Sequence, residues 1–205
     1  RMSRSILLYG DVNANYRDGS RIWLESIAEV LARTGSRVTL LLKAMPADGA
    51  PAFGGDLPCT IIEPAPGHRS IGAGMTVGEA RAQIVELDSD QHFDIVLTRG
   101  FAIANELSTV PELAGRLWPY ITDGPGFDAF SDDAAEDLAR ISLTARRVLV
   151  QTEDARSVWE SRAPAATGKT LLLPPMVPDD SFGHSSQGRI VDAGRRGTSA
   201  APLRL

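Results

Sequence analysis

Polar side chains crowd a ten-residue stretch that follows the first apolar run of this sequence. The stretch, Gly10–Gly19 (GDVNANYRDG), carries Asn13, Asn15 and Arg17. Amide groups donate and accept hydrogen bonds and therefore suit sugar hydroxyls, while an arginine offsets phosphate charge. Loops between a strand and its helix usually have about two to six residues, so this longer loop indicates a binding role. A solvent-exposed arginine without a ligand is the alternative for Arg17.

Four further positions are candidates because of where they stand relative to the expected strands and helices. Gly19 lets the backbone approach a ligand at the start of the first helix, and Ser20 beside it is expected to cap that helix and to bind ligand. Arg99 follows an apolar run and is either a cleft residue or a surface arginine. Asp123 ends another run before Gly-Pro-Gly, where it is either a catalytic carboxylate or only a turn former.

Apolar runs and apolar stripes at helical spacing define the elements that must position these residues. Helices are expected over residues 20–34, from Thr76 to about Leu87, over 102–107, from Ser131 to about 145, and from Thr152 onward. Thr76 and Glu79 have the spacing of a capping box. Strands are expected over residues 5–9, 37–42, 59–62, 93–98, 116–122, 148–151 and 170–173, with Pro119 demoting or bending the centre of its strand.

The alternation of strand and helix predicts an α/β fold. We expect an open, mostly parallel, doubly wound (Rossmann-like) sheet with helices on both faces. Ligands of such sheets bind at the carboxyl ends of the strands, near the point where the strand order reverses. The loops that should face a ligand are therefore Gly10–Gly19, Arg99–Ala102, Asp123–Phe130 and Thr152–Asp154.

Several signatures of other sites fail. Gly168-Lys169-Thr170 lacks the glycine of a P-loop five residues earlier, and Gly72-x-Gly74 lacks the third glycine of a dinucleotide fingerprint. No G-x-S-x-G elbow occurs. Asp88-Ser89-Asp90 fits a solvated helix end better than a metal site, and the three histidines have no ligand spacing. We therefore expect no metal and no cofactor.

Composition limits the class of protein. The 205 residues are 43% hydrophobic and 23% charged, which is ordinary for a globular domain, and the formal net charge is -5. This charge argues against a nucleic-acid partner. A single cysteine excludes an internal disulfide, and no apolar run reaches the length of a transmembrane segment. We expect a soluble, cytoplasmic protein.

Taken in order, these segments resemble the N-terminal half of a GT-B glycosyltransferase of the retaining, family-four type. The residues SILLYGDVNANYRDGSRIWLESIAEVLARTGSRVTLLL are similar to that family's first strand, glycine loop, helix and second strand. FDIVLTRG, LWPYITDGPG, RRVLVQTEDARSVWES and LLLPPMVPDDSF are similar to later segments of the same domain. Thr122-Asp123 stands where the family usually has a His-Asp pair, so the histidine is missing.

The resemblance implies an N-terminal, acceptor-side domain over residues 1–183 and a tail over residues 184–205. RIVDAG in that tail resembles the start of the family's second domain, which normally carries a Glu-x7-Glu motif and binds the donor. No pair of glutamates in this chain has that spacing. Residues 184–205 are either simply a tail or the result of a truncation or a reading-frame change just after the domain boundary, and we expect the chain to be inactive alone.

The implied reaction transfers a sugar from a nucleotide-diphosphate sugar to a saccharide or other acceptor. Asn13, Asn15, Arg17, Gly19, Ser20 and Arg99 are then the predicted binding residues, and Asp123 the predicted catalytic one. An alternative is a non-catalytic α/β module that binds a saccharide or nucleotide, and another is an α/β enzyme completed by an oligomer partner. Because a missing second domain exposes the cleft face, we expect either a homodimer through that face or mobile loops there.

Overall fold

The computed structural model describes residues 3–16, 18–45, 53, 57–65, 74–122 and 132–175, with the backbone alone at 132 and 133. The described residues form a parallel sheet of seven strands in the order β3-β2-β1-β4-β5-β6-β7. The predicted Rossmann-like fold class is confirmed. Its strands are β1 (Ser5–Tyr9), β2 (Arg37–Leu41), β3 (Thr60–Ile62), β4 (Ile95–Arg99), β5 (Leu117–Ile121), β6 (Val148–Val150) and β7 (Thr170–Leu172).

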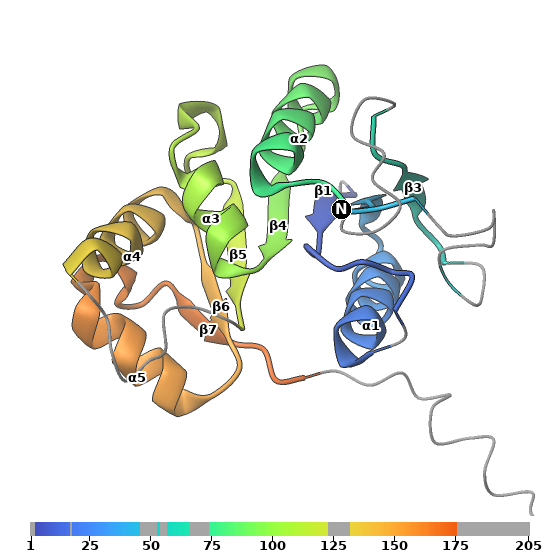
Figure 1. The fold of residues 1–205 in the computed structure, drawn as a ribbon. Helices are drawn as coiled ribbons and strands as arrows, with labels where there is room; N and C mark the ends of the chain where they lie inside the picture. The colour runs from blue at the N-terminus through green and yellow to red at the C-terminus, as the bar shows by residue number, and fades with distance from the viewer. Residues whose placement is uncertain are drawn as a thin grey trace, which may run out of the picture.

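Helices cover both faces of this sheet (Figure 1). On one face α1 packs through Trp23, Leu24 and Ile27. On the other face α2 and α3 share one apolar cluster and α3, α4 and α5 share the next. The bounds are α1 (Gly19–Arg33), α2 (Val77–Gln91), α3 (Phe101–Ser108), α4 (Asp132–Thr144) and α5 (Glu153–Arg162), with 3-10 turns η3 (Pro111–Leu113) and η4 (Pro164–Ala166).

The strand order reverses at β1. The chain passes from β1 to β2 and β3 on one side, and then returns to place β4 on the other side of β1. The loops that leave β1 and β4 therefore diverge, which opens a crevice at the carboxyl ends of these two strands. This is the edge at which the polar loop after β1 was expected to act.

The residue that caps α1 is not the predicted one. Asp18, with extended backbone, accepts hydrogen bonds on Oδ1 from the backbone N–H groups of Ser20 (3.0 Å) and Arg21 (2.9 Å). Ser20 lies inside the helix, because the helix begins at Gly19. Gly35, which follows the C-cap residue Thr34, has φ 85°, the left-handed conformation that is typical of a glycine after a helix end.

Two other expectations need correction. Asp88 is not on a solvated helix end: it is only 4% exposed and binds Arg116 with both carboxylate oxygens. Pro119 does not demote its strand, because β5 lies between β4 and β6 in the interior of the sheet. The ladder between β5 and β6 joins Tyr120 and Ile121 to their partners, so Pro119 precedes it on that side.

Other expected features match or lie outside the described part. Thr76 and Glu79 form both hydrogen bonds of the capping box that opens α2. Thr152 caps α5 by accepting from Ala155 N–H. The predicted cap at Ser131 and the predicted domain boundary at residue 183 lie outside the described residues. Among the helices that the structure describes, none has both the length and the apolar character needed to cross a membrane.

Candidate functional site

An open cavity of about 330 Å³ lies where β1, β4 and β6 end. It combines residues from three βα connections, as the strand order predicts for this edge of the sheet. Three of the predicted binding residues, Gly19, Ser20 and Arg99, line it together. Asp18 also lines it; it belongs to the Gly10–Gly19 loop that was expected to face a ligand but was not a predicted site residue. The sequence did not point to the other three lining residues, which are Trp23, Gln151 and Pro175.

The lining residue Trp23 belongs to a stacked aromatic pair, whose second member, Tyr120, is not among the lining residues. The ring of Trp23, from the second turn of α1, lies 4.8 Å from the ring of Tyr120 at an angle of 14°. Trp23 is 4% exposed and Tyr120 is fully buried. Neither the indole Nε1 nor the Tyr120 hydroxyl has a hydrogen-bond partner with normal geometry. Buried polar groups without partners are costly, and they mark places where a ligand or water completes the bonding.

Among the lining residues that the structure describes, Arg99 is a cation and Asp18 is an anion. The guanidinium of Arg99 lies 5.7 Å from the centre of the Trp23 ring, a cation–π arrangement. The carboxylate of Asp18 lies at the start of α1, in the connection between β1 and α1. Burial raises the pKa of Tyr120, while Gln151 and the charge of Arg99 act in the opposite direction. Asp18 and Arg99 thus bring opposite charges to the described lining.

Asn13 and Asn15 are not among the residues that line the cavity. The side chain and backbone N–H of Asn15 both donate to Asn13 Oδ1, at 2.9 Å and 3.1 Å. The same Asn15 amide donates to Met45 O at 2.9 Å. These bonds brace the loop after β1 against the end of β2. Arg17 and Asp123, also predicted site residues, lie outside the described part of the chain.

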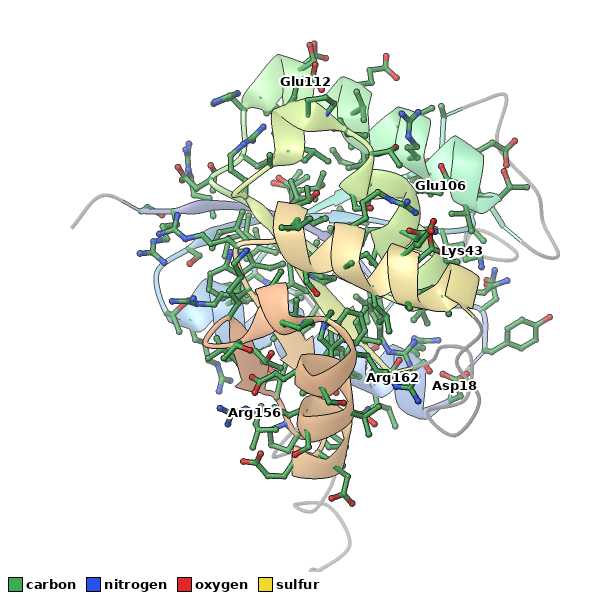
Figure 2. The ribbon with its side chains drawn as sticks, turned by 90° about the vertical axis from the view of Figure 1, so that its left-hand side faces the viewer. Asp18, Lys43, Glu106, Glu112, Arg156 and Arg162 are labelled. Atoms are coloured by element: carbon green, nitrogen blue, oxygen red, sulfur yellow. The ribbon has the colours of Figure 1, made fainter. Side chains whose placement is uncertain are left out.

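A second polar group lies at the same edge, between the ends of β1 and β2. The buried hydroxyl of Tyr9 donates to Asp11 Oδ1 at 3.0 Å, and Lys43 Nζ lies 2.9 Å from the same oxygen. Asp11 has φ 44°, a left-handed conformation that is uncommon outside glycine. Asp18 and Lys43 both lie toward the right-hand side of Figure 2. This group fixes the direction in which the loop leaves β1.

A smaller cavity of about 140 Å³ lies at the opposite edge of the sheet. Arg4, Asp94, Ile95, Trp118 and Arg146 line it, and they come from the amino ends of their strands. Among the residues that the structure describes, no group of three or more His, Cys, Asp or Glu is arranged to hold a metal ion. The cavity of about 330 Å³ is the better candidate for a substrate site, because it is larger and lies at the carboxyl ends of the strands.

Comparisons with known proteins agree with the fold. No family model and no curated protein sequence matches this chain. Among solved structures, sucrose-phosphate synthase from Thermosynechococcus elongatus matches with a TM-score of 0.61 at 12% identity, over 83% of this chain and 48% of that one. LpCGTa in complex with UDP matches with a TM-score of 0.52 at 10% identity, over 88% of this chain and 55% of that one.

At such low identity these matches establish the fold alone. This chain spans about half the length of either structure. Its seven parallel strands and its helices on both faces have the arrangement of those neighbours, and the chain has the fold of an N-terminal GT-B domain.

Proposed function

We propose that this chain is the acceptor-side half of a glycosyltransferase. The complete enzyme would also have a second, donor-binding domain. Together the two domains transfer a sugar from a nucleotide-diphosphate sugar to a saccharide or other acceptor. The observation that carries the proposal is the cavity at the ends of β1, β4 and β6, at the switch point of a fold that matches half of two larger proteins. One of these two is by name a sucrose-phosphate synthase, and the other is bound to UDP.

Within this proposal each predicted residue has a stated part. Arg99 holds a cationic side chain against Trp23 inside the cavity, where it attracts the negative charge of a donor or positions an acceptor. Asn13 and Asn15 do not line the cavity, and the two hydrogen bonds that Asn15 donates to Asn13 hold the loop after β1 in place. Arg17 contributes a second cation, and Asp123 is the catalytic carboxylate that follows β5.

Sugar transfer tests the proposal directly. We expect no transfer by the 205-residue chain and transfer once a Glu-x7-Glu donor domain follows it. Arg99→Ala should then lower kcat/KM about tenfold or more, since it removes a charged contact at the site. Arg33→Ala is the matched control, because Arg33 lies in the last turn of α1, at the far end of the helix from the cavity. Transfer by the chain alone would contradict the predicted inactivity.

A non-catalytic binding module is the second candidate. The observation in its favour is that the described residues of this chain already form a cavity with polar side chains, among them Asp18, Arg99 and Gln151. Calorimetric titration with a panel of nucleotide sugars, nucleotides and saccharides separates the two functions. Binding without transfer, in the presence of a second domain as well as without it, would favour the module.

A further inference from the structure

The smaller cavity lies at the amino ends of the strands, away from the candidate substrate site. Its volume is about 140 Å³, and it is lined by Arg4, Asp94, Ile95, Trp118 and Arg146. These residues lie at or near the starts of β1, β4, β5 and β6. A protein cavity of about 150 Å³ holds one benzene molecule, so this cavity has room for a small ion and not for a nucleotide.

The two cations of this lining have no partner in the part of the chain that the structure describes. The side chains of Arg4 and Arg146 form no ion pair and no hydrogen bond there. Their backbones are nevertheless fixed. Arg4 O accepts from Arg37 N–H at 2.7 Å, and Arg146 N–H donates to Leu117 O at 3.0 Å. The sheet therefore holds two unpaired guanidinium groups at one cavity.

Asp94 adds a carboxylate that Ser5 holds in place. Its Oδ2 accepts from the Ser5 backbone N–H at 2.8 Å and from the Ser5 hydroxyl at 3.0 Å. These hydrogen bonds, followed by the charges of Arg37 and Arg4, lower the pKa of Asp94. Asp94 is therefore ionised at neutral pH and only accepts hydrogen bonds. Among the described residues none donates to its Oδ1.

An anion in this cavity meets two cations and one hydrogen-bond acceptor. Guanidinium groups bind the oxygens of phosphate and sulfate through their planar N–H donors. The Asp94 carboxylate repels such an anion unless the anion has a proton to donate. Phosphate carries a hydroxyl group at neutral pH, whereas sulfate carries none. The undescribed residues that adjoin Arg4 in the sequence, Arg1 and Met2, bring no negative side chain.

We propose that this cavity binds phosphate, with Arg4 and Arg146 holding the anion and Asp94 accepting a hydrogen bond from its hydroxyl group. Asp94 is then the specificity residue, because it favours a protonated phosphoryl group over sulfate. The ligand is free phosphate or a phosphoryl group of a larger molecule, since both present the same oxygens. The site is separate from the cavity at the carboxyl ends, and this proposal does not rest on the proposed function.

Titration of the 205-residue chain with inorganic phosphate at constant ionic strength tests the site. The NMR signals of the Ser5 backbone amide and the Trp118 indole report binding at the cavity itself. We expect a Kd of about 1 mM for phosphate, and about three- to tenfold weaker binding of sulfate. Arg146→Gln should weaken phosphate binding about tenfold, because it removes a charged hydrogen-bond donor. Failure of phosphate to shift the two signals would overturn the proposal.

The matched control is Arg156→Gln. Arg156 lies in α5, pairs with Glu153 and Glu160, and does not line the cavity. This variant should bind phosphate like the wild type. Equal weakening by Arg156→Gln and Arg146→Gln would show that phosphate responds to overall charge, which would also overturn the proposal.

Asp94→Asn tests the selectivity. Asparagine keeps an oxygen for the two hydrogen bonds from Ser5, so the variant should fold normally. Without the negative charge, sulfate should bind about three- to tenfold more tightly than to the wild type, and the preference for phosphate should disappear. A preference that survives in the variant would overturn the role of Asp94. Glycerol 3-phosphate distinguishes the two sources: tighter binding than inorganic phosphate indicates a larger phosphorylated molecule, and weaker binding indicates free phosphate.

Discussion

Tyr9 shows how one buried hydroxyl ties the first strand to the loop that forms the site. Its ring packs in the apolar cluster beneath α2 and α3, and its hydroxyl reaches Asp11 at the start of the loop. Lys43 balances the charge of Asp11 from the end of β2. Burial, followed by the charge and the hydrogen bond of Asp11, raises the pKa of Tyr9 far above its ordinary value.

This shift predicts a loss of stability in alkaline solution. The unfolded chain releases the tyrosine proton near pH 10, while the folded chain retains it. Stability from this group is therefore complete below about pH 10 and falls as the pH rises further. Tyr9→Phe should reduce the slope of the free energy of unfolding against pH by about 1.4 kcal/mol per pH unit above pH 10. Urea denaturation at several alkaline pH values measures this slope.

The control for this prediction is Tyr16→Phe. Tyr16 is 62% exposed, so its replacement removes a tyrosine hydroxyl without touching the buried interior. The slope of this variant should equal that of the wild type. An unchanged slope in Tyr9→Phe would show that the buried hydroxyl does not govern the alkaline transition.

Local sequence could not decide which residue caps α1. Aspartate and serine are both favoured N-cap residues, and Asp18 and Ser20 are separated by only one position. The choice depends on where the chain turns from the loop into the helix. The direction of that turn depends on how the loop is held, by the ion pair of Asp11 with Lys43 and by the hydrogen bond to Met45 O. Only the folded sheet brings these residues together. The complete set of residues that line the cavity could not be predicted from the sequence for the same reason.

The elements themselves were largely predictable. Each of the seven strands coincides with an apolar run. The inner strands are apolar because both of their faces are covered, whereas the edge strands β3 and β7 leave apolar side chains such as Ile61 and Leu171 exposed. The capping box at Thr76 and the cap at Thr152 are local signals and were found at their residues. The rejection of a P-loop at Lys169 agrees with the structure, in which Lys169 Nζ donates to carbonyl groups at the end of α4.

Long-range ion pairs were not predictable, and Asp88 is the clearest case. The local sequence predicts that Asp88 lies at a solvated, polar helix end. In the structure Arg116, 28 positions later in the chain, binds Asp88 and covers it. The two side chains form a bidentate pair with both N–O distances at 2.7 Å. Arg116 also donates to the carbonyl groups of Phe93 and Glu112. The pair thus fastens the end of α2 to the start of β5, and the hydrogen bonding of Arg116 to Asp88, in which Arg116 donates, raises the pKa of Arg116.

Breaking this pair should be costly. Asp88→Ala leaves a largely buried guanidinium without its counter-charge, and we expect it to destabilise the fold by about 3–5 kcal/mol. Asp90→Ala is the matched control, because Asp90 belongs to the same Asp-Ser-Asp segment but is exposed. It should change the free energy of unfolding by less than about 0.5 kcal/mol. Chemical denaturation compares the two, and equal effects would show that the buried pair does not fasten α2 to β5.

At the scale of the whole molecule, the amino ends and the carboxyl ends of the parallel strands have different roles. The amino ends of the strands are held by hydrogen bonds, such as those that Ser5 donates to Asp94, and by the ion pair of Asp88 with Arg116 before β5. The carboxyl ends carry the cavity and the long loop after β1. In the structures that this chain matches over about half their length, further protein accompanies this domain. A partner at the carboxyl edge would complete the cleft, as the proposed function requires.

A second copy of the chain is the partner that we expect when that protein is absent. Tyr16, 62% exposed in the loop at the carboxyl edge, should then contribute to the contact. Leu143, 69% exposed, provides a control, because it lies at the end of α4, next to the start of β5. Sedimentation velocity should show a concentration-dependent dimer that Tyr16→Ser weakens about tenfold or more, whereas Leu143→Ser leaves it unchanged. Weakening by Leu143→Ser instead would place the contact at the opposite edge, and a monomer at every concentration would refute the dimer.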